Sequence, residues 1–213
     1  MSVVCSCVDC SVRACCGNGA SPPDFCLSKN VTSADVESAL DILINKDSAL
    51  ATAAAQTDCD GYCDRSRIEE VMHLAKLMGI RKLGIATCVG LFQEARQLAR
   101  VFRAHGYEVY GVACKCGSVP LTAIGITPGE NAKGPYMCNP VLQANLLNQQ
   151  GTQLNVAFGL CVGHDSLFYK YSDAYVTTLV AKDRLLCHNP IAPLYLLDGY
   201  WKKLLAEDPY VDF

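Results

Sequence analysis

Apolar and polar positions from residue 82 onward fall into blocks that predict strands and helices in turn. The expected strands are short apolar runs, and they cover 83–88, 107–114, 154–160 and 175–181. The expected helices cover 91–105, 140–150, a short stretch after His164, and 193–205. This alternation predicts an α/β fold, a Rossmann-like parallel sheet of about four strands flanked by helices.

The chain before residue 82 has a different pattern. Residues 1–30 lack periodicity and are rich in Cys, Gly, Ser and Pro. A helix is expected from residue 33 to about 55 with a break near 45–48, then a loop at 59–64, then a helix over 64–78. We therefore expect a Cys-rich metal-binding segment at 1–30 and an α/β domain over 31–213, with Trp201 and the last tyrosines in its core.

Composition narrows the class of protein. The 213 residues are 51% hydrophobic with a formal net charge of −3, and no run of lysines or arginines occurs. Nucleic acid and a membrane surface are therefore not expected as partners. No apolar stretch reaches the length of a membrane span, and the N-terminus lacks the pattern of a secretory signal. We expect a cytoplasmic protein.

The 14 cysteines are the outlier in this composition. Disulfides are rare in a reducing compartment. This large number of thiols therefore favours metal binding or catalysis. The first group has the spacing Cys7-x2-Cys10-x4-Cys15-x10-Cys26. Four thiolates in a short segment can hold one Zn²⁺ or one [4Fe-4S] cluster, and the spacing does not decide between them. Cys5 and Cys16 could replace two of these ligands, and a metal-free, redox-sensitive tail is the alternative.

A second group of cysteines appears once the strands are aligned. Each lies where a predicted strand ends or a helix begins: Cys88, Cys114, Cys138 and Cys161. Ligands of open α/β sheets bind outside the carboxyl ends of the strands, so we expect these four thiols to converge there. Possible additions are Cys63 and Cys116, with His164 or His188 as a nitrogen ligand or proton donor. The alternative is a set of independent core cysteines.

Weaker signals come from charged residues near this edge. Arg65 and Arg67 most simply form a solvated helix face, although either could bind an anionic substrate near Cys63. The stretch 182–184, Lys-Asp-Arg, is either a surface turn or a wall of the site.

These motifs together resemble a family of predicted metal-binding proteins, domain of unknown function 1847. The resemblance rests on Cys7, Cys10 and Cys15 and on the stretches 61–63, 84–90, 137–140, 159–166, 180–184 and 188–190. It covers nearly the whole chain and implies metal binding without a settled reaction. The chain departs from the family pattern in its extra thiols at Cys5, Cys16, Cys59 and Cys116.

The leading functional hypothesis is an iron–sulfur protein of anaerobic metabolism, a reductase if it is an enzyme. A cluster on the N-terminal cysteines would relay electrons from a donor protein to a second cluster in the sheet crevice. There a small anionic substrate would be reduced, with His164 or Asp165 supplying a proton. Iron is preferred because zinc has no redox chemistry, and a sheet with its own core needs no structural zinc. A homo-oligomer could complete either site.

Two alternatives belong to other classes. One is a zinc-stapled module that binds a metal or a partner protein without catalysis. The other is a thiol enzyme in which Cys161 is the nucleophile and His164 its base, which requires the short loop between them to turn back on itself.

Overall fold

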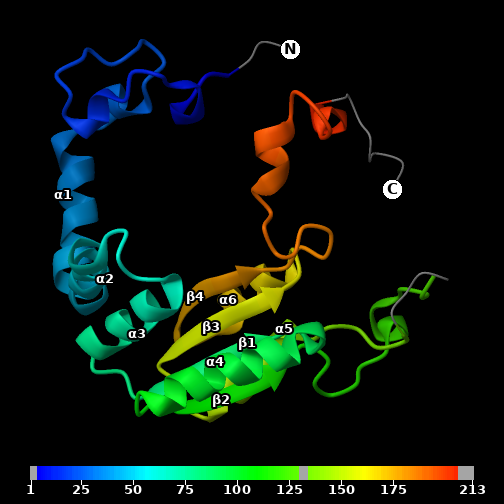
Figure 1. Cartoon of the computed structure of the whole chain (residues 1–213). Helices are drawn as coiled ribbons and strands as arrows, with labels where there is room; N and C mark the ends of the chain where they lie inside the picture. Colours follow the sequence, from blue (N-terminus) through cyan, green and yellow to red (C-terminus); the bar gives the residue numbers. More distant parts are fainter. Residues whose placement is uncertain (1–3, 130–133, 206–213) are drawn as a thin grey trace. The chain divides into compact units, whose positions relative to one another are not determined.

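The computed structural model describes residues 4–129 and 134–205 of the chain. It divides into two compact units, Met1–Asp60 and Gly61–Phe213, both drawn in Figure 1. The segment 1–30 singled out in the sequence lies within the first unit, together with the helices that follow it.

The first unit consists of short helical turns followed by two helices. Single 3₁₀ turns cover Cys7–Asp9, Ala14–Cys16 and Leu27–Asn30. Helix α1 covers Ser33–Asp41, and Thr32 caps it by accepting a hydrogen bond from the Asp35 amide. A π-helical turn at Ile42–Lys46 separates α1 from α2, Ser48–Gly61, so the expected break is present.

The loop expected at 59–64 begins only after Gly61. Cys59 and Asp60 lie on the last turn of α2. Both side chains are exposed to solvent, so their polarity does not prevent the helix from continuing through them. Helix α3 then covers Arg67–Leu77, because Ser66 caps it in a reciprocal pair of hydrogen bonds with Glu69.

The second unit is built on a parallel sheet of four strands, as the alternating pattern predicted. The strands are β1, Lys82–Thr87; β2, Glu108–Ala113; β3, Leu154–Leu160; and β4, Tyr175–Ala181. Their order is β2-β1-β3-β4, and every neighbouring pair is parallel. The chain therefore reverses direction across the sheet after β2, which makes the gap between β1 and β3 the topological switch point.

Helices cover both faces of this sheet (Figure 1). Helices α3 and α4, Phe92–Ala104, pack against one face in a core that includes Leu83, Ile85, Phe102 and Val156. On the other face α5, Pro140–Gln149, and α6, His164–Tyr171, pack in a second core around Leu147 and Phe168. The architecture is α/β with three layers.

The helix expected over 193–205 is wrong. That stretch contains two 3₁₀ turns, Ala192–Leu196 and Lys202–Leu205, and Tyr195 and Tyr200 are exposed rather than in a core. Consecutive apolar residues such as Leu194–Leu196 cannot all face one side of a helix, so the stretch has no single apolar face to bury. None of the helices in the described ranges combines the length and apolar character that a membrane span requires.

A bulge in β3 shapes the end of this strand. Its pairing with β4 shifts on either side of Phe158, and Gly159 has a φ of +73°. A Cβ atom at Gly159 would lie 2.1 Å from Cδ1 of Leu91, so glycine allows the bulge and the packing of Leu91 together. The bulge sits two residues before Cys161.

We expect Gly159→Ala to lower the free energy of unfolding by about 3 kcal/mol, because it adds a steric collision to a left-handed backbone. Gly151→Ala is the matched control: Gly151 has a φ of +64° but open space around it, so it should cost about 1 kcal/mol. Urea unfolding followed by circular dichroism measures both, and equal losses would contradict a role for the collision.

Candidate metal centre

Four of the predicted site cysteines lie at the carboxyl edge of the sheet. Cys88 follows β1, Cys114 follows β2, Cys161 follows β3, and Cys138 stands one residue before the Asn139 cap of α5. Cys88 and Cys114 are 7% and 3% exposed, and the other two are half-buried. They are neither scattered through the core nor on the outer surface.

The sulfurs of this edge interact with one another. The thiol of Cys88 hydrogen-bonds to Cys114, Cys114 hydrogen-bonds to Cys138, and Cys161 lies near enough to Cys138 to act on its charge. Backbone amides add to this network: Val89 donates to Sγ of Cys114 and Gly90 to Sγ of Cys88, each at 3.4 Å. Three sulfurs from separate elements are thus linked by hydrogen bonds, and Cys161 lies close to one of them; we call these four residues the crevice cysteines.

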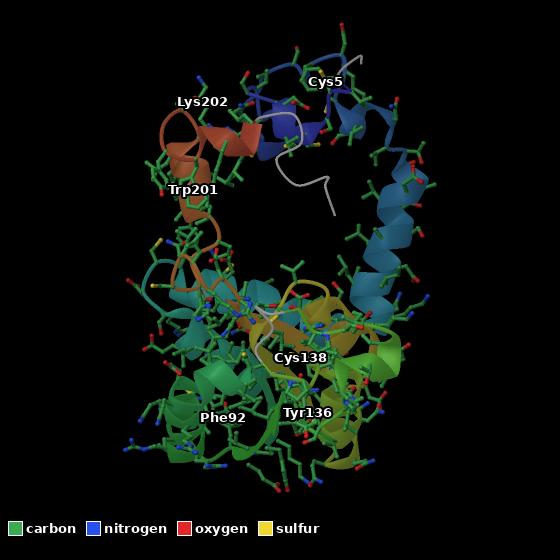
Figure 2. The ribbon with its side chains drawn as sticks, turned by 90° about the vertical axis from the view of Figure 1, so that its right-hand side faces the viewer. Cys5, Phe92, Tyr136, Cys138, Trp201 and Lys202 are labelled. Atoms are coloured by element: carbon green, nitrogen blue, oxygen red, sulfur yellow. The ribbon has the colours of Figure 1, made fainter. Side chains whose placement is uncertain are left out.

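A backbone clasp brings Cys138 to Cys114. The amide of Asn139 donates to the carbonyl of Cys114 at 2.6 Å, and the amide of Met137 donates to the carbonyl of Val119 at 2.8 Å. Lys115 Nζ donates to the carbonyl of Tyr136 at 2.8 Å. Figure 2 labels Tyr136 and Cys138 on the segment leading into α5.

A buried glutamine fixes the strand ends under the crevice cysteines. Gln143 of α5 is fully buried, and its Nε2 donates to the carbonyls of Thr87, at 3.2 Å, and Val112, at 2.8 Å. These carbonyls lie next to Cys88 and just before Ala113–Cys114. Sequence reasoning missed Gln143, although a polar residue on the inner face of an otherwise apolar helix was a signal that could have identified it.

Cationic side chains lie around the same sulfurs. Nη2 of Arg184 donates to Sγ of Cys161 at 3.2 Å. Lys182 and Lys115 lie close enough to act on the charges of Cys88 and Cys138. The stretch 182–184, open in the sequence between a turn and a wall of the site, therefore contributes side chains to the site.

The hydrogen-bond chain sets the acidities of these thiols. Donation to Cys114, with burial, raises the pKa of Cys88 to about 12. Donation to Cys138 raises the pKa of Cys114, whereas the hydrogen bond from Cys114 lowers the pKa of Cys138. Cys138 is thus the thiol of this connected trio that loses its proton most readily.

The other candidates at this edge have different surroundings. Nδ1 of His188 accepts from the Asp183 amide at 3.1 Å, so it stabilises the loop 183–188. His164 and Asp165 begin α6, with both amides donating to the carbonyl of Cys161, and Nδ1 of His164 is buried without a hydrogen-bond partner. The loop after Cys161 thus turns back on Cys161, but the Cys161 sulfur accepts a hydrogen bond from Arg184 and not from His164.

Two further cysteines considered in the sequence differ from each other: Cys116 lies close enough to Cys114 for the two charges to interact, whereas Cys63 does not join the crevice cysteines. Cys116 is half-buried, and its thiol donates to the carbonyl of Asn139 at 3.9 Å. Cys63 is exposed, with a φ of +62°, and has no recorded sulfur contact among the described residues.

The first unit contains a separate group of cysteines. A cavity of about 80 Å³ in it is lined by the four predicted ligands of the N-terminal segment, Cys7, Cys10, Cys15 and Cys26. Cys5 and Cys16, which the sequence left open as replacements, do not line it. The other residues that line it are Arg13, Ala14, Pro22, Pro23, Phe25 and Ser28.

Neither group forms a ready-made site for a single ion. Within residues 4–129 and 134–205, no group of three or more His, Cys, Asp or Glu side chains is arranged so that it could hold a metal ion. All of the described cysteines are free thiols. In the crevice the sulfurs contact one another in a row, Cys88 to Cys114 to Cys138.

Comparison with known proteins shows the family of the chain. The model of the family described as protein of unknown function, DUF1847, matches residues 26–179. The chain belongs to this family. An uncharacterized protein from Methanocaldococcus jannaschii is 42% identical over 156 residues, which cover 73% of this chain and 80% of the relative. No solved structure matches.

The matched range divides the candidate ligands. It contains Cys26 and all four crevice cysteines, whereas Cys7, Cys10 and Cys15 lie before it and Arg184 lies after it. The resemblance expected over nearly the whole chain is therefore shown for residues 26–179 of this DUF1847 member.

We expect Gln143→Met to lower the free energy of unfolding by about 2 kcal/mol, because two buried carbonyls lose a donor. Gln149→Met, at an exposed position of the same helix, is the control and should change stability little. Urea unfolding provides the measurement. A loss no greater than that of the control would mean that Gln143 does not hold the strand ends.

In metal-free protein, we expect iodoacetamide to modify Cys138 with a lower pH midpoint than Cys88. Only the thiolate reacts, and the pKa of Cys138 is lowered whereas that of Cys88 is about 12. Mass spectrometry of peptides labelled between pH 7 and 10 should show Cys138 levelling off while Cys88 is still rising with pH. The pH midpoint of each profile does not depend on how accessible the thiol is to the reagent, so the two midpoints can be compared directly. Coincident profiles would contradict the hydrogen-bond chain.

Proposed function

We propose that this protein is an iron–sulfur redox protein whose principal centre is held by Cys88, Cys114, Cys138 and Cys161. The observation that carries the proposal is the gathering of four cysteines at the carboxyl edge of a parallel sheet, three of them linked by hydrogen bonds and the fourth, Cys161, close to Cys138. Ligands of open α/β folds bind at that place. Four thiolates are also the ligand set that a [4Fe-4S] cluster requires.

The surroundings favour a ligand site over a set of core cysteines. A core cysteine behaves as a small apolar side chain with apolar neighbours. Here the sulfurs accept hydrogen bonds from Val89, Gly90 and Arg184. Such donors stabilise the thiolate, which is the form that binds metal.

The same donors suit a redox centre. Hydrogen bonds to the ligand sulfurs and nearby positive charge raise the reduction potential of an iron–sulfur cluster. Arg184, Lys182 and Lys115 would offset the negative charge of four thiolates. Zinc would make no use of this tuning, because it has no redox chemistry.

Binding requires a local rearrangement of the sulfurs. They lie in a row, and none of the described side-chain groups is preformed for an ion. A cysteine side chain has one torsion, and its three staggered rotamers move the sulfur while the backbone stays in place. Strand register, the clasp at Asn139 and the Gln143 hydrogen bonds keep that backbone fixed.

The N-terminal cysteines would hold the second centre. The four that line one small cavity, Cys7, Cys10, Cys15 and Cys26, are the ligand set proposed. In this function the N-terminal centre passes electrons from a donor protein to the crevice centre, where a small anionic substrate is reduced. His164 and Asp165, on the first turn of the helix after Cys161, are the proposed proton donors.

We expect anaerobically purified protein to be brown, with absorbance near 400 nm and equal amounts of iron and acid-labile sulfide. Cys161→Ser and Cys7→Ser should each remove about half of the iron if there are two like centres, since each removes a ligand from one of them. Cys187→Ser, at an exposed thiol outside both groups, is the matched control and should keep all of it.

Other results would point elsewhere. Zinc without sulfide, lost in the same two variants, would replace the redox function with a zinc-stapled module. Loss of all the iron from either variant would argue for one shared centre. Full metal content in both variants would exclude these cysteines as ligands.

A further inference from the structure

A second cavity of the α/β unit lies away from the cysteines. It has a volume of about 560 Å³, within the range of small-molecule sites. Its walls come from α3 and from the residues just before β1 and β2, including Arg81 and Tyr107. The parallel strands all begin at one edge of the sheet (Figure 1). The residues just before β1 and β2 place this cavity at that amino edge, whereas the crevice cysteines follow the strands at the carboxyl edge.

Three cations line this cavity without a partner carboxylate. They are Arg65, Lys76 and Arg81, and within the described residues none of them is in ion-pair distance of an Asp or Glu. Nη1 of Arg65 is also buried without a hydrogen-bond partner. This nitrogen packs over Gly61 and is covered by protein atoms, so the cations that can reach a ligand in the cavity are the exposed Lys76 and Arg81.

The one carboxylate in the lining is already engaged. Oε2 of Glu69 accepts from the amide and the hydroxyl of Ser66, at 2.8 and 2.6 Å, as the cap of α3. Arg65 lies near enough to act on the charge of Glu69 but does not pair with it. The cavity therefore keeps an excess of positive charge.

Apolar side chains form the remainder of the wall. Met72, Ile80 and Tyr107 line the cavity, and the hydroxyl of Tyr107 is occupied by donation to the carbonyl of Met72 at 2.8 Å. The ring of Tyr107 thus presents an apolar surface near Arg81, whose charge acts on this tyrosine. A ligand that fits both halves has an anionic group and a flat apolar part.

We propose that this cavity is a binding site for a small organic anion, a phosphate or carboxylate attached to an apolar ring. Arg81 and Lys76 bind the anionic group, and the ring lies against Tyr107, Met72 and Ile80. Paired charge-assisted hydrogen bonds from arginine give such a site its strength. The site is separate from the crevice cysteines and does not depend on the metal they bind.

The test is isothermal titration calorimetry of the full chain at low ionic strength. The probes are phenyl phosphate, phthalate and inorganic phosphate. The first two should bind more tightly than inorganic phosphate, which cannot use the apolar wall. The tighter of phenyl phosphate and phthalate identifies the anionic group. Arg81→Gln should weaken that binding about tenfold, and Lys76→Gln should also weaken it.

The control is Arg100→Gln, an exposed arginine of α4 outside the cavity, which should leave binding unchanged. Thermal unfolding of each variant shows whether it is folded. If Arg81→Gln is not folded, the binding of Lys76→Gln decides the result. Three results would each overturn the proposal. The control could weaken binding as much as the cavity variants do, inorganic phosphate could bind as tightly as the ring-bearing probes, or no probe could bind.

Discussion

The parallel register of four strands is the constraint on which the rest of this structure depends. Because β2, β1, β3 and β4 all run the same way, every residue that follows a strand arrives at one edge. Cysteines that are distant in the chain thereby come to the same edge, since Cys88, Cys114 and Cys161 each follow a strand. Hydrogen bonding of the ladders fixes this edge without need of any sulfur contact.

Buried polar groups then place individual side chains at that edge. Gln143 bonds the ends of β1 and β2 to α5, and the Asn139 amide bonds the start of α5 to Cys114. The bulge at Gly159 turns the last residues of β3, with Leu91 packed against the glycine. The Nε2 of Gln143 and the amide of Asn139 would be costly to bury without their acceptors, so these hydrogen bonds favour a single arrangement of the backbone around the sulfurs.

The two edges of the sheet differ in chemistry. The carboxyl edge gathers sulfur, with cations around it, whereas the amino edge gathers cations over an apolar wall with no thiol in its lining. Both follow from what stands at the ends of the same strands. In this DUF1847 member the proposed metal centre and the proposed anion site therefore lie at opposite edges of one small sheet.

Local sequence determined the strands and most helices, because hydrophobic period and caps act over a few residues. The strands at 154–160 and 175–181 agree with the structure to the residue, and Pro140 opens α5 as expected. Local pattern failed at 193–205, where a run of apolar residues has no helical face, and it placed the end of α2 too early.

Tertiary structure alone decided which distant groups meet. Strand ends predicted that four cysteines share an edge, but the sulfur contacts, the Arg184 hydrogen bond and the role of Gln143 depend on side-chain packing across elements. The amino-edge cavity was likewise invisible, because its cations come from a helix, a loop and a strand start that no spacing relates. A sequence specifies periodicity within an element, whereas convergence between elements depends on how their faces pack.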